Sequence, residues 1–182
     1  MKIIRAAIML SFILGLCASA SQAQSVQTDF DRSFDFSKLK SFNFIIQQRR
    51  AADPLAQDSL NDGRIRAALE AELMANGYRR ESAGRPDFAL AYYVTTQSKY
   101  DVQDYGYGAP RWFARRDIRV NQYTEGTLLV DVIDPVTGQL VWRGRASGAV
   151  ELKDAGKKIN RSAEKLVKQF VKDGQRKGGK AS

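Results

Sequence analysis

The stretch from Glu125 to Gly144, EGTLLVDVIDPVTGQLVWRG, constrains the fold more than any other part of the chain. Apolar and polar residues alternate on both sides of the central segment DPVTGQ, which is typical of two half-buried strands joined by a turn. Pro135 presets the backbone at the first turn position, and Gly138 can adopt the left-handed conformation that closes such a loop. The stretch therefore predicts an antiparallel hairpin within a larger sheet.

The alternation also predicts which side chains of this hairpin are buried. One apolar face is expected to contain Leu128, Val130, Val132, Leu140 and Trp142. The other face then carries Asp131 opposite Arg143 and Arg145. This alignment requires an odd loop length or a bulge at Gly138. Structural roles are therefore assigned to Pro135, Gly138 and Trp142, because they set the turn and fill the face.

Two segments have the periodicity of amphipathic helices. In residues 58–77, Ile65, Leu69 and Leu73 recur at four-residue spacing, with Asp58 or Ser59 as the start signal and Asn76-Gly77 as the stop. Residues 154–174 form the second predicted helix, which Gly174 is expected to end. Its apolar stripe consists of Ile159, Ala163, Leu166, Val167 and Phe170.

Alternating patterns at residues 26–30, 37–46 and 87–102 predict three more strands, which makes about five in all. The expected fold class is α+β: an antiparallel or mixed sheet with both helices packed on one face, in the order β-β-α-β-β-β-α.

The first 23 residues have the pattern of a secretory signal peptide. Lys2 and Arg5 precede an apolar run that is shorter than the ~20 residues needed to span a bilayer, and small residues follow at cleavage spacing. Cleavage after Ala23 would leave one domain at residues 24–174 and a disordered basic tail at 175–182. The expected location is periplasmic or secreted. The alternative is a lipid anchor through Cys17, although Leu16 departs from the small residue expected before an acylated cysteine.

The chain contains no histidine, and its one cysteine lies within the predicted signal peptide. Nucleophile systems that depend on histidine and zinc sites built from cysteine or histidine are therefore excluded. Glu125 and Asp131 fall about 20 Å apart along one strand, too far for a glycosidase pair. We expect a binding or structural module without enzymatic activity, cofactor or metal. The alternative is a small envelope enzyme that uses carboxylates or tyrosine.

The positive charge is concentrated at the C-terminal end. Residues 24–151 contain 17 basic and 17 acidic residues, whereas residues 152–182 contain 10 basic and 3 acidic ones. On the second helix, the basic positions proposed for binding are Lys158, Lys165, Lys168 and Lys172. The expected partner of an exported basic surface is an envelope protein, a polyanion or an anionic membrane surface, rather than nucleic acid. A solvated helix face is the alternative.

Residues 100–126 contain interleaved aromatic and arginine residues without a clear period. The positions proposed for binding are Tyr105, Tyr107, Arg111, Trp112, Arg115, Arg116 and Arg119. Aromatic faces and guanidinium groups together suit stacking and anion binding. The alternative is a flap whose aromatic side chains cover the sheet while its arginines face water.

Four segments, in order, resemble a bacterial envelope family called domain of unknown function 4136. They are TDFDRSFDFSKLKSFNF, LNDGRIRAALEAELMANGY, PDFALAYYV and YTEGTLLVDVIDPVTGQLVWRGRASG. The resemblance implies an exported α+β domain and brings no catalytic residue with it. Many relatives carry a lipoprotein cysteine, a pattern from which Cys17 after Leu16 departs.

Overall fold

The computed structural model describes residues 25–45, 58–104 and 118–178, in which six strands form one mixed sheet. Its elements are β1 (Ser25–Phe30), η2 (Phe36–Lys38), β2 (Ser41–Phe44), α3 (Ser59–Ala75), β3 (Arg79–Arg80), β4 (Phe88–Asp104), β5 (Ile118–Ile133), β6 (Leu140–Ala149), η3 (Leu152–Asp154) and α4 (Ala155–Gly178).

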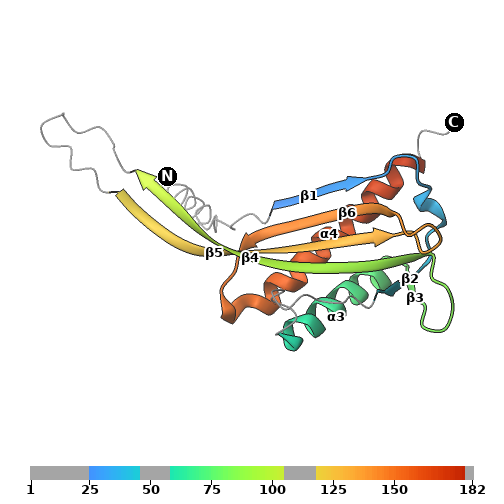
Figure 1. Ribbon diagram of the computed structural model, residues 1–182, viewed down its shortest axis with the longest axis horizontal. Helices are drawn as coiled ribbons and strands as arrows, with labels where there is room; N and C mark the ends of the chain where they lie inside the picture. The colour runs from blue at the N-terminus through green and yellow to red at the C-terminus, as the bar shows by residue number, and fades with distance from the viewer. Residues whose placement is uncertain (1–24, 46–57, 105–117, 179–182) are drawn as a thin grey trace, which may run out of the picture.

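The strands lie in the order β1-β6-β5-β4-β2-β3. Neighbours from β1 to β4 are antiparallel, whereas β2 is parallel to both β4 and β3. Both helices cover the same face of the sheet (Figure 1). The α+β class and the two-layer arrangement are confirmed. The sixth strand, β3, was not predicted, because a two-residue strand such as Arg79–Arg80 is too short to show a period.

The core forms where the helices cover the sheet. Val130 and Val132 of β5 pair with Tyr92 and Leu90 of β4, and all four side chains are buried. The predicted helix positions complete this core: Ile65, Leu69 and Leu73 from α3, and Ala163, Leu166, Val167 and Phe170 from α4. The period of two in the strands and of about four in the helices therefore indicated the buried faces correctly.

The turn of the β5–β6 hairpin forms as predicted, but the register of β6 after the turn differs from the prediction. Gly138 has a φ of 71°, and Asp134 accepts hydrogen bonds from the Val136 N–H and the Thr137 hydroxyl. These contacts, the Val136 N–H first, lower the pKa of Asp134. The register then shifts between Val132↔Trp142 and Ile133↔Leu140, so the bulge places an additional residue, Val141, in β6.

Because of this bulge, one residue that was predicted to be in the core is exposed. Leu140 is 43% exposed, whereas Val141 is 3% exposed. Placing Leu140 on the same buried face as Trp142 was wrong, because the irregularity lies at Val141 and not at Gly138. An inserted residue reverses the alternation on one side of it.

The helix ends agree with the prediction at three positions out of four. Asp58 caps α3 by accepting from the Asn61 N–H, and Gly77 has a φ of 89° just beyond its C-terminus. α4 does not end at Gly174 but continues to Gly178, so residues 175–178 of the predicted tail are helical. At Gly174, a Cβ would lie 3.2 Å from that of Phe36, which indicates that this glycine serves close packing rather than termination.

β4 and β5 extend together beyond the helices as a two-stranded ribbon (Figure 1). Their pairing runs from Ala89↔Ile133 to Asp104↔Ile118, whereas β6 accompanies β5 only as far as Glu125. The strands predicted to end at residue 102 and to begin at Glu125 are therefore longer than expected, and the irregular segment predicted between them was wrong for 103–104 and 118–124. Residues 121–124 are exposed, and a strand segment without a buried face does not need the apolar alternation by which strands are recognised.

Candidate ligand pocket

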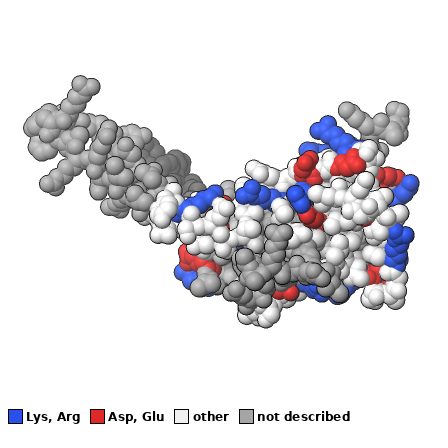
Figure 2. All heavy atoms as spheres, viewed as in Figure 1, with Lys and Arg blue, Asp and Glu red and all other residues white. Residues whose placement is uncertain are grey.

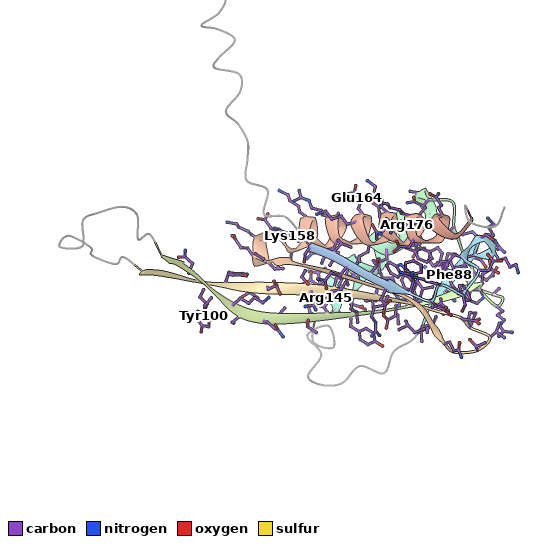
Figure 3. All side chains as sticks on the ribbon, turned by 90° about the horizontal axis from the view of Figure 1, so that it is seen from above. Phe88, Tyr100, Arg145, Lys158, Glu164 and Arg176 are labelled. Carbon is purple, nitrogen blue, oxygen red and sulfur yellow. The ribbon has the colours of Figure 1, made fainter. Side chains whose placement is uncertain are left out.

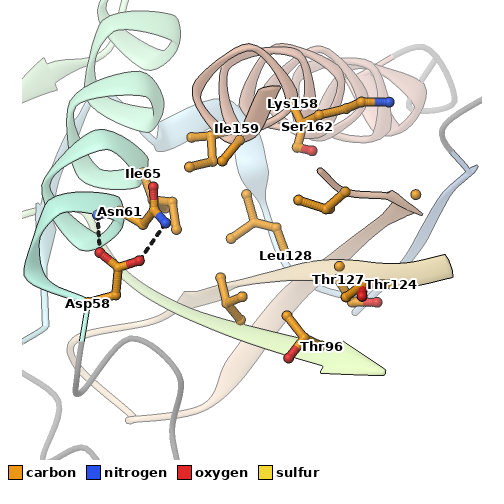
Figure 4. A pocket seen from close by; sticks show the side chains of 15 residues that line it. Asp58, Asn61, Ile65, Thr96, Thr124, Thr127, Leu128, Lys158, Ile159 and Ser162 are labelled. Carbon is orange, nitrogen blue, oxygen red and sulfur yellow. Dashed lines mark hydrogen bonds between the residues drawn. The ribbon is translucent and has the colours of Figure 1, made fainter. Parts of the chain in front are cut away.

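A pocket of about 430 Å³ lies where α3 and α4 begin, between the two helices and the sheet (Figure 4). Residues of α3, α4, three strands and the segments next to them line it. They are Asp58, Asn61, Ile65, Val94, Thr96, Thr124, Gly126, Thr127, Leu128, Gly148, Val150, Ala155, Lys158, Ile159 and Ser162. Protein pockets that take small molecules typically enclose roughly 300–1,000 Å³.

Two paired glycines form part of the floor. Gly126 of β5 is opposite Gly148 of β6, and Thr96 of β4 is the other neighbour of Gly126. A Cβ on Gly126 would lie 2.5 Å from Cγ2 of Val150. The glycine therefore allows the chain to turn inward after β6, where the Val150 N–H donates to the carbonyl of Thr124 over 2.9 Å.

The inner walls are aliphatic. Ile65 of α3 and Leu128 of β5 are 1% and 6% exposed, and Val94 and Ile159 are half-buried at the edge of the main core. None of the described residues that line the pocket is aromatic. The interior therefore offers apolar contact without a planar stacking surface.

Two of the described lining residues, Asp58 and Lys158, are charged. Asp58 accepts from the Asn61 backbone N–H over 2.9 Å and from the Asn61 side-chain amide over 2.6 Å, so both oxygens serve the start of α3. Lys158 extends along the rim from the first turns of α4 (Figure 4). It contributes weakly to lowering the pKa of Glu151, whose main cause is a hydrogen bond from Lys153.

Tyr92 of β4, which contacts α3, is not set up as a base. Its hydroxyl donates to Asp62 of α3, and its side chain is 3% exposed. Burial, followed by the contact with Asp62, raises the pKa of Tyr92. A phenol held in the protonated form does not favour proton abstraction near neutral pH.

The residues proposed from the sequence fall into two groups. Tyr105, Tyr107, Arg111, Trp112, Arg115 and Arg116 lie outside the described residues, as do the signal peptide and Cys17; Arg119 is in β5, but its side chain is not described. The four lysines all lie on α4, and one of them, Lys158, reaches the pocket. Lys168 forms an ion pair with Glu164 over 2.6 Å, and Lys172 is exposed.

The pocket itself was not predicted. Its two floor glycines interrupt alternating strands, which is a recognised signal for a bulge or for close approach of another group. That signal does not show that two helix starts converge above the glycines, because the convergence depends on tertiary packing.

The cationic side of the molecule is the outer surface of α4. Lys158, Glu164 and Arg176 mark this helix in Figure 3, on the opposite side of the sheet from Arg145. On the face seen in Figure 2, basic and acidic side chains are interspersed. Arg143 donates two hydrogen bonds of 2.7 and 2.6 Å to Asp131, whereas Arg145 donates to Ser147.

Two further features are absent from the described residues. None of the helices there is both long and apolar enough to cross a bilayer. Within the same residues, no group of three or more acidic, histidine or cysteine side chains is arranged to hold a metal ion.

Together the fold and the pocket define an α+β domain with a ligand-sized hollow between its helix starts and its sheet. A family model described as Domain of unknown function (DUF4136) matches residues 26–170, and the chain belongs to this family. The predicted family is confirmed, and the membership is consistent with a protein of the cell envelope. Among curated proteins, none matches the chain.

The solved structures to which this chain is similar include the following two. A PDZ domain protein from Parabacteroides distasonis has 13% identity and a TM-score of 0.53; the match covers 80% of this chain and 35% of that one. This chain therefore spans about a third of that protein's length. The PelC dodecamer from Paraburkholderia phytofirmans has 13% identity over 80% of this chain and 95% of that one, with a TM-score of 0.44. The first likeness shows a shared fold alone, and the second is too distant to support an inference.

Proposed function

We propose that this chain is an exported, non-enzymatic protein of the cell envelope that binds a small apolar ligand in the pocket. The observation that carries the proposal is an aliphatic hollow of about 430 Å³ between the two helix starts and the sheet. Among the described lining residues the one carboxylate, Asp58, serves as a helix cap, which favours binding over catalysis. The signal-peptide pattern and the family support export.

The proposal is tested with an uncharged fluorescent probe, N-phenyl-1-naphthylamine. Thr96 lines the pocket from β4 and is exposed, so the substitution Thr96→Trp fills the entrance without entering the core. Thr95→Trp is the matched control, because Thr95 is also exposed but points to the opposite face of the sheet. Saturable binding is expected for the wild type and for Thr95→Trp, with a loss of about tenfold or more for Thr96→Trp. Equal affinities for both variants, or no binding by the wild type, would overturn the proposal.

A second candidate function is attachment to an anionic membrane surface through α4. Exposed basic residues continue along this helix, including Arg161, Lys168 and Lys172. Its apolar face is buried in the core, so such an attachment would be electrostatic and would weaken with salt. Sedimentation with vesicles containing anionic lipid, at low and high salt, tests it. Binding that is absent at low salt removes this candidate without affecting the pocket.

A further inference from the structure

The lining of the pocket indicates the class of its ligand, on the basis of the proposed function above. Ile65, Leu128 and Ile159 border the interior from α3, β5 and α4, and the described lining contains no aromatic ring. Flexible aliphatic chains fit such a surface, because they gain contact by adjusting their torsions rather than by stacking. The part of the ligand that lies between the helices and the sheet is therefore an aliphatic chain.

The two charged side chains of the described lining offer no spare counterion to a ligand. Both oxygens of Asp58 accept hydrogen bonds from Asn61. Lys158 already has an interaction partner in the protein, and its charge acts on the carboxylate of Glu151. Because the two charges are also opposite in sign, the lining favours neither an acidic nor a basic head group. An ionic head group would leave water without gaining a partner, which costs more than the transfer of a neutral polar group.

Two threonine hydroxyls provide neutral hydrogen-bonding groups at the sheet side of the pocket (Figure 4). Thr96 of β4 is paired with Gly126 of β5, and Thr124 lies two residues before this glycine. Both threonines are exposed, and both are on the same face of the sheet as Leu128. Each hydroxyl can donate or accept, so a neutral head group at this edge can form hydrogen bonds with either strand.

We propose that the pocket binds an uncharged single-chain amphiphile, with its aliphatic chain between the two helices and the sheet and a neutral polar head group at Thr96 and Thr124. Fatty alcohols and monoacylglycerols have this chemistry. The chain provides most of the affinity through apolar burial, and the hydrogen bonds at the edge set its orientation.

The first test compares 1-decanol with decanoate and decylammonium, which have the same chain length but opposite charges. Each is titrated at neutral pH, below its aggregation limit, as a competitor of N-phenyl-1-naphthylamine. In the wild type, 1-decanol is expected to bind about fivefold or more tightly than either ion. Binding of either ion that equals or exceeds that of 1-decanol overturns the inference.

The second test removes the hydroxyls with little change of shape. The double variant Thr96→Val/Thr124→Val should weaken the binding of 1-decanol about threefold to tenfold, while the affinity for the probe stays unchanged. Thr95→Val is the matched control, because Thr95 is exposed on the opposite face of the sheet. An unchanged affinity of the double variant for 1-decanol overturns the inference, because the head group would then lie elsewhere.

Chain length provides an independent readout. From 1-octanol to 1-dodecanol, each additional buried methylene is expected to tighten binding about fourfold until the pocket is full. Thr96→Trp should weaken the whole series, and Thr95→Trp should leave it intact. An alcohol series that Thr96→Trp leaves intact while it weakens probe binding overturns the inference alone. Absence of probe binding by the wild type overturns the proposed function itself.

Discussion

The indole N–H of Trp142 in β6 donates a hydrogen bond over 3.2 Å to the carboxylate of Asp173 in α4, 31 residues further along the chain. Asp173 is 1% exposed and also accepts from the Thr28 hydroxyl over 2.9 Å and from the Gln169 amide over 2.7 Å. Arg176 lies 3.7 Å from the same carboxylate. One buried carboxylate therefore joins β1, β6 and α4.

Replacing this carboxylate should destabilise the protein strongly. Asp173→Ala leaves the buried indole N–H of Trp142 and the half-buried donors of Thr28 and Gln169 without their acceptor, so we expect a loss of about 2–3 kcal/mol in the free energy of unfolding. Asp173→Asn should lose less, because its carbonyl oxygen still accepts. Urea unfolding measures both, with Lys172→Ala as an exposed control expected to stay within about 0.5 kcal/mol of wild type. A loss for Asp173→Ala no larger than that of the control would contradict this role.

Gly144 is expected to tolerate no side chain. A Cβ there would lie 2.2 Å from the ring of Trp142 and 2.7 Å from Cδ2 of Leu166, both of which are buried. Gly144→Ala should therefore cost about 1–3 kcal/mol through overpacking and change the near-ultraviolet circular dichroism of the tryptophan. Gly156→Ala is the control, because nothing lies within 4 Å of its added Cβ. It should be neutral or slightly stabilising, since alanine favours a helix. The prediction is wrong if the two variants unfold alike.

Because of the bulge in β6, we expect substitutions at two adjacent residues to affect stability differently. Val141→Thr introduces a hydroxyl at a position that is 3% exposed and should cost about 1–2 kcal/mol. Leu140→Thr alters a side chain that is 43% exposed and should change stability by less than about 0.5 kcal/mol. Thermal or urea unfolding of the two variants checks the register directly. The reverse ranking would place the irregularity at the turn instead.

Asp87 should contribute stability that depends on pH. Its Oδ2 accepts from the Lys40 N–H over 2.9 Å and from the N–H and hydroxyl of Ser41 over 2.8 and 2.9 Å. These contacts, the Lys40 N–H first, lower the pKa of Asp87 in the folded state. Stability from a lowered pKa is fully present above the unfolded value, about 3.9, and is lost as the pH falls through the folded pKa.

Asp87→Ala should therefore reduce the free energy of unfolding by about 1 kcal/mol at pH 7. The difference from wild type should shrink as the pH falls below about 3.9. Urea unfolding at a series of pH values measures it. Ser82→Ala, an exposed change without a titrating group, should differ from wild type by an amount that does not vary with pH. A difference for Asp87→Ala that is equally constant would argue against the carboxylate as its source.

Local patterns in the sequence were sufficient for the layers of this fold but not for its details. The alternation of Val130 and Val132 and the spacing of Ile65 and Leu69 reflect a shared buried core, so they predicted which faces meet. The burial of Val141 in place of Leu140 could not be predicted, because the position of a bulge is set by pairing across strands.

The candidate site was predicted only at Lys158. The pocket depends on how far the starts of α3 and α4 lie from Gly126 and Gly148, a distance that neither periodicity nor composition encodes. Gly174 was misread for a related reason. A glycine near the end of a helical pattern can indicate either termination or close packing, and contact with Phe36 distinguishes the two.

The first strand of the sheet has its described partner near the end of the chain. β1 pairs with β6, from Ser25↔Ser147 to Phe30↔Trp142, so the residues that it pairs with lie between 112 and 122 positions further along the chain. Contacts of such long sequence separation form slowly. A chain that emerges N-terminus first cannot complete this sheet until β6 is present. During synthesis, such a topology delays completion of this edge of the sheet until Ala149 has been added, and until then β1 lacks the strand with which it pairs.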